Sequence, residues 1–138
     1  MKKPIQLVML VDDSSLDNMI HTRILKKSGL VEEIIAFEYA EDALKYLQNE
    51  NHGVDVIFLD LNMPRMDGYE FLEEYHKLSS IQRAKTLVMM LSTSSRPGDA
   101  ERAKQFPHVI DYQSKPLGIE TLESIVRHHF SDDTEASV

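Results

Sequence analysis

Cysteine is absent from the 138-residue sequence, and this absence excludes both disulfide bonds and thiolate metal sites. Long hydrophobic runs are also missing, because no stretch approaches the roughly eighteen apolar residues that a membrane-spanning helix requires. The short apolar run near the N-terminus ends in two aspartates rather than in the small-residue cleavage site of a signal peptide. We therefore interpret that run as a strand and expect a soluble protein.

Basic residues are in the minority, with 15 lysines and arginines against 23 aspartates and glutamates, for a formal net charge of −8. Such a charge repels the phosphate backbone, so we expect no nucleic-acid binding. Internal repeats and glycine-, serine- or proline-rich linkers are missing as well, and the length suits one compact domain. We expect this domain to span residues 1–130, followed by an acidic, disordered tail at residues 131–138.

Apolar runs alternate with segments of helical periodicity along the chain. The runs predict five strands, at residues 5–11, 34–37, 54–59, 87–91 and 109–112. The periodic segments predict five helices: from Ser14 or Ser15 to Gly29, 40–49, one that begins at Gly68, 99–105 and 119–130. In the first of them the helical spacing is carried by Leu16, Met19, Ile20, Ile24 and Leu25. The alternation predicts an α/β fold with a doubly wound, five-stranded parallel sheet and helices on both faces.

Polar residues follow four of the predicted strands, at the edge where open parallel sheets place their functional sites. The strand ends carry, in chain order, Asp12 and Asp13, then Asp60, then Ser92 and Thr93, and finally Lys115 and Pro116. In a sheet of order 2-1-3-4-5, strands 1, 3, 4 and 5 are neighbours. We therefore expect these side chains to converge.

Clustered carboxylates repel one another, so this site needs a cation or a proton. Mg²⁺ suits a ligand set without sulfur or imidazole. Asp60 can then act as a nucleophile and form an acyl phosphate, while Lys115 and Ser92 stabilise the phosphoryl oxygens. Each residue also has a purely structural interpretation: Asp12 and Asp13 can cap the next helix, and Asp60 can be an ordinary loop aspartate. Three strand ends with matching groups favour the chemical interpretation.

Four short stretches resemble the response-regulator receiver family of two-component signalling. They are VDDS at 11–14, FLDLNMPRMDG at 58–68, MLST at 90–93 and SKPL at 114–117. The resemblance covers about residues 5–130, and the segment DLNMPRMDG with a downstream KP is highly specific. It implies the flavodoxin-like receiver fold, here as a stand-alone domain of a cytoplasmic, bacterial protein.

The resemblance also implies a role for each matching residue. Asp60 is the phosphoacceptor, Ser92 the hydroxyl switch, Lys115 the phosphate-pairing lysine and Tyr112 the aromatic switch. The metal, Mg²⁺ or possible Mn²⁺, is held by Asp13, Asp60, the backbone carbonyl of Asn62 and, through water, Asp12. The Lys115–Pro116 bond is expected to be cis. Thr93 departs from the alanine that is common after the switch hydroxyl, and its bulk bears on the rates of phosphoryl transfer and hydrolysis.

The partners implied by the resemblance are proteins. A histidine kinase or histidine phosphotransfer protein would phosphorylate Asp60, and Ser92 and Tyr112 would then rearrange. The changed surface would comprise the helix at 99–105, the strand at 109–112 and the helix at 119–130, and it would dock an output protein or a second copy in a homodimer. Neither nucleic acid nor a membrane is an expected partner.

Three other functions remain open on the sequence. A phosphohydrolase with an aspartyl nucleophile shares this chemistry, but by resemblance it has a second aspartate where this chain has Asn62, which cannot exchange a proton. A binding module could keep the fold without the chemistry. A flavodoxin-like cofactor binder would need a Gly/Ser/Thr-rich phosphate loop after the first strand, where this chain has aspartates.

The six histidines are not expected to take part in the chemistry. His21, His52, His76 and His108 are predicted to face solvent, and His128 and His129 to complement the dipole at the end of the last helix. Adjacent helical positions point in different directions, so the last two are not expected to form a metal pair.

Overall fold

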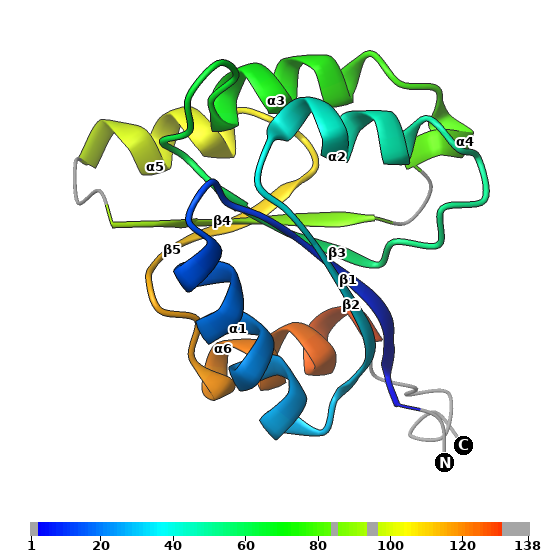
Figure 1. The fold of residues 1–138 in the computed structure, drawn as a ribbon, viewed down its shortest axis with the longest axis vertical. Helices are drawn as coiled ribbons and strands as arrows, with labels where there is room; N and C mark the ends of the chain where they lie inside the picture. Colours follow the sequence, from blue (N-terminus) through cyan, green and yellow to red (C-terminus); the bar gives the residue numbers. More distant parts are fainter. Residues whose placement is uncertain (1–2, 84–85, 94–96, 131–138) are drawn as a thin grey trace.

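The computed structural model describes residues 3–83, 86–93 and 97–130, so the expected tail at 131–138 lies outside the described residues. Five parallel strands form one sheet in the order β2-β1-β3-β4-β5, which confirms the predicted doubly wound α/β fold (Figure 1). The strands are β1 (Ile5–Val11), β2 (Val31–Phe37), β3 (Val56–Asp60), β4 (Leu87–Ser92) and β5 (Val109–Ser114).

Helices cover both faces of this sheet. They are α1 (Ser15–Ser28), α2 (Ala40–Leu47), α3 (Gly68–His76), α4 (Ser80–Arg83), α5 (Pro97–Lys104) and α6 (Ile119–Ile125), which continues as a π-helical segment, Val126–Phe130. Figure 1 shows α2, α3 and α5 on one side of the sheet and α1 and α6 on the other. The predicted count of five helices was wrong, since the described residues include the additional short α4, so the predicted fourth and fifth helices are α5 and α6.

Successive residues of the central strands point to opposite faces, and each face has its own apolar core. Met9 and Val11 of β1 belong to the core under α2, α3 and α5. Val8 and Leu10 belong to the core under α1 and α6. Burial on both faces explains why the central strands are continuous apolar runs rather than alternating ones.

Helix α1 is present as predicted, but of the residues in the predicted apolar spacing only Leu25 belongs to its fully buried stripe. Leu16, Met19 and Ile20 are exposed, by 60%, 52% and 38%. The buried residues are Asn18, His21 and Leu25. Asn18 faces inward because its Nδ2 donates a hydrogen bond of 2.9 Å to the carbonyl of Asp12, at the end of β1. This polar contact with the sheet edge and the burial of Leu25 in the core fit the observed rotation of the helix.

The amino edge of the sheet buries two polar side chains, His52 and Thr86, in a chain of hydrogen bonds. Thr86 Oγ1 donates to the Val54 carbonyl at 2.7 Å, and the Val54 N–H donates to His52 Nδ1 at 2.9 Å. His52 Nε2 then contacts the carbonyl of Gln82. Because Nδ1 accepts, the imidazole is neutral and Nε2 is the donor. The expectation that His52 faces solvent was therefore wrong, since it is 7% exposed.

No helix among the described residues combines the length and the apolar character that crossing a membrane demands.

Candidate functional site

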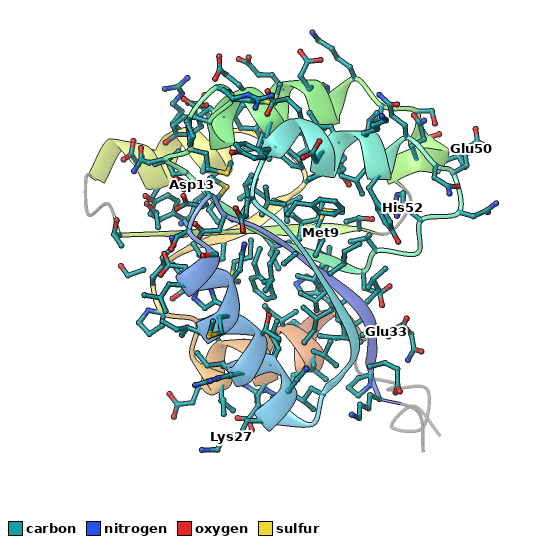
Figure 2. The ribbon with its side chains drawn as sticks, in the orientation of Figure 1. Met9, Asp13, Lys27, Glu33, Glu50 and His52 are labelled. Carbon is teal, nitrogen blue, oxygen red and sulfur yellow. The ribbon has the colours of Figure 1, made fainter. Side chains whose placement is uncertain are left out.

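The predicted site residues lie at the carboxyl edge of the sheet, opposite His52 (Figure 2 labels Asp13 and His52 at the two ends). Asp60 is the last residue of β3, and Ser92 is the last residue of β4. Asp12 follows β1 directly, and Lys115 follows β5. The parallel order β1-β3-β4-β5 brings these four strand ends to one place.

Three carboxylates gather at this edge. One oxygen atom from each of Asp12, Asp13 and Asp60 lies within 4.8 Å of the others. Asp12 and Asp60 are buried, at 4% and 6% exposure, whereas Asp13 is exposed. The cluster therefore opens to solvent on the side of Asp13, while its other two members are held inside the protein.

Lys115 binds the buried side of the cluster. Its Nζ lies 2.6 Å from Asp12 Oδ2, 2.8 Å from Asp17 Oδ2 and 3.1 Å from Asp60 Oδ1. The Lys115 side chain is only 11% exposed. Burial alone would lower the pKa of Lys115, but hydrogen bonds to Asp12 and Asp17 and the charge of Asp60 raise that pKa well above its usual range. The ammonium is therefore permanently charged in the folded protein.

The charged form of the Asp60 carboxylate is destabilised by its surroundings. Burial raises the pKa of Asp60 to about 6, and the charge of Asp12 adds to this effect. Lys115 acts in the opposite direction but does not cancel it. The edge thus holds four aspartates, counting Asp17, and one lysine, which pairs with three of them. A hard divalent cation with oxygen ligands, such as Mg²⁺, fits this donor set because it would offset the excess negative charge.

Asp12 does not cap α1, since the N-cap is Ser14, but it supports the cap residue and also belongs to the cluster. Its Oδ1 accepts the N–H of Ser14 at 2.9 Å, while its Oδ2 accepts from Lys115. Ser14 in turn caps α1, because its Oγ accepts the N–H of Asp17 at 3.1 Å. Asp12 can therefore support the turn before α1 and bind Lys115 at once, since the two contacts use different oxygens.

The loop after β3 folds back on itself, so that Gly68 lies beside Leu61, which follows β3 directly. The Gly68 N–H donates to the Leu61 carbonyl at 2.8 Å. A Cβ at Gly68 would lie 2.7 Å from the Asp60 carbonyl oxygen, which is closer than atoms can approach, so the position requires glycine. The preceding Asp67 forms a capping box with Glu70 and begins α3 there. Asn62 lies exposed in this loop.

The remaining predicted residues lie on β4 and β5. Ser92 is fully buried and Thr93 is exposed. The Lys115 N–H donates to the Ser92 carbonyl at 3.0 Å, which joins the two strand ends. The expected cis Lys115–Pro116 bond is present. Tyr112 lies partly buried on β5, in register with Met90. The switch roles of Ser92 and Tyr112 stay predictions, and Ser94, next in the loop, lies outside the described residues.

Two residues at this edge were not anticipated from the sequence. Asp17 binds Lys115, and its only sequence signal is an acid in the first turn of a helix. His21 was predicted to face solvent, but it is 3% exposed. Its Nε2 has no hydrogen-bond partner among the described groups of the protein. The pKa of His21 is lowered by burial first and by the charge of Lys115 second.

Comparison with known proteins identifies the family. A family model of the response regulator receiver domain matches residues 8–127, and the chain belongs to this family. The chain is 28% identical over 122 residues to the sensor histidine kinase CheAY of Helicobacter pylori, covering 88% of this chain but only 14% of that protein. It is 29% identical over 129 residues to response regulator Rcp1 of Synechocystis, covering 90% of this chain and 86% of Rcp1.

Solved structures share the fold. A two-component response regulator from Cytophaga hutchinsonii superposes with a TM-score of 0.86 at 28% identity, covering 95% of this chain and all of that one. The Mn²⁺-bound form of response regulator Rcp1 superposes with a TM-score of 0.70 at 26% identity, covering 91% and 95%. The fold is thus the flavodoxin-like receiver fold, and two-component signalling is the setting of this family.

Proposed function

We propose that the chain accepts a phosphoryl group on Asp60 from a histidine kinase or a histidine phosphotransfer protein and then controls an output protein. The observation that carries this proposal is the position of the Asp60 carboxylate. It is buried at the end of β3, beside two further aspartates and within 3.1 Å of Lys115. Membership of the receiver family supports the same function. We place this proposed function in the cytoplasm.

The metal of this proposal is Mg²⁺, with Mn²⁺ as the ion bound in the Rcp1 relative. Its ligands would be Asp13, Asp60 and the Asn62 backbone carbonyl, with Asp12 acting through water. Bound there, the cation would neutralise charge on the carboxylates and on the incoming phosphoryl oxygens. Asp13 is the exposed member of the cluster, so a cation would enter from its side.

In the transfer step, a carboxylate oxygen of Asp60 attacks the phosphorus atom, and a P–O bond forms. The bond from phosphorus to the donor histidine nitrogen breaks, and its electron pair stays on the imidazole ring. Lys115, already beside Asp60, pairs with the phosphoryl oxygens. The Ser92 hydroxyl donates a hydrogen bond to one of them. Asn62, two residues after Asp60, has no proton to exchange, which suits a phosphoacceptor better than a phosphohydrolase.

The switch follows from this hydrogen bond. Movement of the Ser92 hydroxyl toward the phosphoryl group vacates space that the Tyr112 ring enters, and the surface formed by α5, β5 and α6 is repacked. That surface would dock the output protein or a second copy of the chain. Comparing Tyr112 with and without beryllofluoride tests this part, because an unchanged ring excludes it.

The decisive experiment is incubation with acetyl phosphate, with Mg²⁺ or with a chelator, followed by intact mass measurement. We expect a mass increase of one phosphoryl group that requires the cation and is absent in Asp60→Asn. An unmodified wild-type protein, or modification that persists in the variant, would refute the proposal. Sustained turnover of a small phosphomonoester would instead indicate a phosphohydrolase.

A further inference from the structure

Lys115 has a carboxylate partner that lies outside the cluster of three. Asp17 Oδ2 is 2.8 Å from Lys115 Nζ, a shorter distance than that from Asp60 Oδ1, 3.1 Å. Asp17 comes from α1 and is not among the carboxylates whose oxygens group closely enough to share a metal ion. Its side chain is 31% exposed. The side chain of Asp17 therefore reaches the site through the lysine.

The ammonium group of a lysine has three N–H donors. Lys115 has three carboxylates around it, so its donors are divided among Asp12, Asp17 and Asp60. Formation of an acyl phosphate on Asp60 removes the carboxylate charge of that residue and releases the donor that faces it. The other two donors stay with Asp12 and Asp17, and they decide where the ammonium points while it binds the phosphoryl group.

Asp17 is well placed to serve as such an anchor, because its backbone is fixed to the same edge of the sheet. It is the third residue of α1, and its N–H donates to Ser14 Oγ. The Ser14 N–H donates to Asp12 Oδ1. Two hydrogen bonds therefore hold Asp17 in place relative to Asp12, the other anchor of Lys115.

We propose that Asp17 is a positioning residue of the phosphoacceptor site, which acts through Lys115 by holding its ammonium in place as Asp60 is phosphorylated. The inference rests on the proposed function of Asp60 and extends it to a residue that makes no contact of its own with the reacting atoms. Loss of the Asp17 charge would leave the ammonium with one fixed carboxylate instead of two at the moment of transfer.

The test uses Asp17→Asn, which keeps the size of the side chain and removes its charge. We expect the phosphorylation rate by acetyl phosphate at saturating Mg²⁺ to fall roughly tenfold, because a misplaced charge stabilises the transition state poorly. The half-saturating Mg²⁺ concentration should change less than about twofold, since Asp17 is outside the metal cluster. Asp17→Glu, which restores the charge, should recover most of the rate.

Asp42→Asn is the matched control. Asp42 is an exposed acid and the third residue of α2, as Asp17 is of α1, so both variants lose the same helix-dipole interaction. The control should phosphorylate at the wild-type rate. Rates are measured at a temperature where circular dichroism shows all variants folded.

Three results would overturn the inference: a wild-type rate in Asp17→Asn, an equal loss in the control, or a Mg²⁺ requirement that rises in step with the lost rate. Failure of the wild-type protein to react at all would refute the proposed function instead, so the two failures are distinguishable.

Discussion

The two edges of the sheet both bury polar side chains, but they satisfy them in opposite ways. At the amino edge, His52 and Thr86 are neutral and joined in a continuous chain of hydrogen bonds. At the carboxyl edge, Asp12 and Asp60 are buried as acids that share Lys115. His52 and Thr86 find their partners within the chain, whereas the carboxyl edge has an excess of negative charge.

The difference indicates what each edge does. A buried polar group with all its partners stabilises the fold, because removing either partner leaves the other unsatisfied. A buried carboxylate with a raised pKa destabilises the charged form of the protein until a cation or a chemical group offsets it. The carboxyl edge is therefore prepared for a ligand at a cost to stability, as expected of a functional site.

The largest expected effect is at the carboxyl edge. Asp60→Asn should stabilise the metal-free protein at pH 8 by about 2–3 kcal/mol, because it removes a carboxylate whose pKa is raised from 3.8 to about 6. The folded state binds the Asp60 proton more tightly than the unfolded state, so wild-type stability is lost as the pH rises through this interval. The gain should thus vanish below pH 3.8 and be complete above pH 6.

Urea unfolding in a chelator, repeated across this pH range, measures the gain. Asp42→Asn, which removes an exposed acid, is the control and should show no comparable change. Saturating Mg²⁺ should stabilise the wild type more than the variant. A variant less stable than the wild type at pH 8 would show that the edge carries no excess charge.

The second effect has the opposite sign and belongs to the amino edge. Thr86→Val should destabilise the protein by about 2 kcal/mol, because the buried Val54 carbonyl loses its donor at 2.7 Å. Phosphorylation of Asp60 should be unaffected. Thr93→Val, at an exposed threonine of the carboxyl edge, is the control for thermal unfolding and should be nearly neutral. If Thr86→Val and Thr93→Val destabilised the protein equally, the two edges would not differ in how they satisfy their polar side chains.

A third, smaller effect comes from His21, whose buried Nε2 lacks a partner in the part of the chain that the structure describes. His21→Leu should stabilise the protein by about 1 kcal/mol at pH 8. The gain should grow as the pH falls below 6.5, because the lowered pKa of His21 means that the unfolded state binds this proton first. Denaturant unfolding at pH 8 and at pH 5 measures the stability gain at each pH. Destabilisation at both pH values would show that the imidazole is satisfied.

The smallest effect is at the exposed rim of the carboxyl edge. Arg65 has a left-handed φ of 70°, and its guanidinium pairs with Glu41 at 3.0 Å and lies over the Tyr39 ring. Arg65→Ala should cost at most about 1 kcal/mol, because the ion pair is exposed. Arg65→Gly loses the same contacts but relieves the backbone, so thermal unfolding should find it about 1 kcal/mol more stable than the alanine variant.

Much of the fold could be predicted because it depends on apolar patterns. Strands buried on both faces are continuous apolar runs, and β1 begins and ends where the sequence predicts. The short helix α4 could not be predicted, since it is a single turn with no buried residue. The exposed apolar residues of α1 show a further limit: spacing identifies a helix, but its observed rotation fits the polar contact of Asn18 with the sheet edge, which apolar spacing does not reveal.

The site was predictable to the extent that its residues stand at strand ends. Asp12, Asp13, Asp60 and Lys115 lie together because topology converts four sequence positions into neighbours. Asp17 was missed because its partner is 98 positions away, and a helical acid by itself indicates only a dipole interaction. Burial of His21 and His52 likewise depends on partners that no local pattern specifies.

The return of the chain from Asp60 to Gly68 has a consequence for protein engineering. Because the N–H of Gly68 binds the Leu61 carbonyl, residues 61–67 form a segment whose two ends touch. Such a segment can be exchanged for one from a relative without moving the strand before it or the helix after it, provided that Gly68, the capping Asp67 and the buried Leu61 and Met63 stay. Exposed positions of this segment such as Asn62 could therefore be varied as a cassette, which separates tuning of the chemistry from the scaffold that supports it.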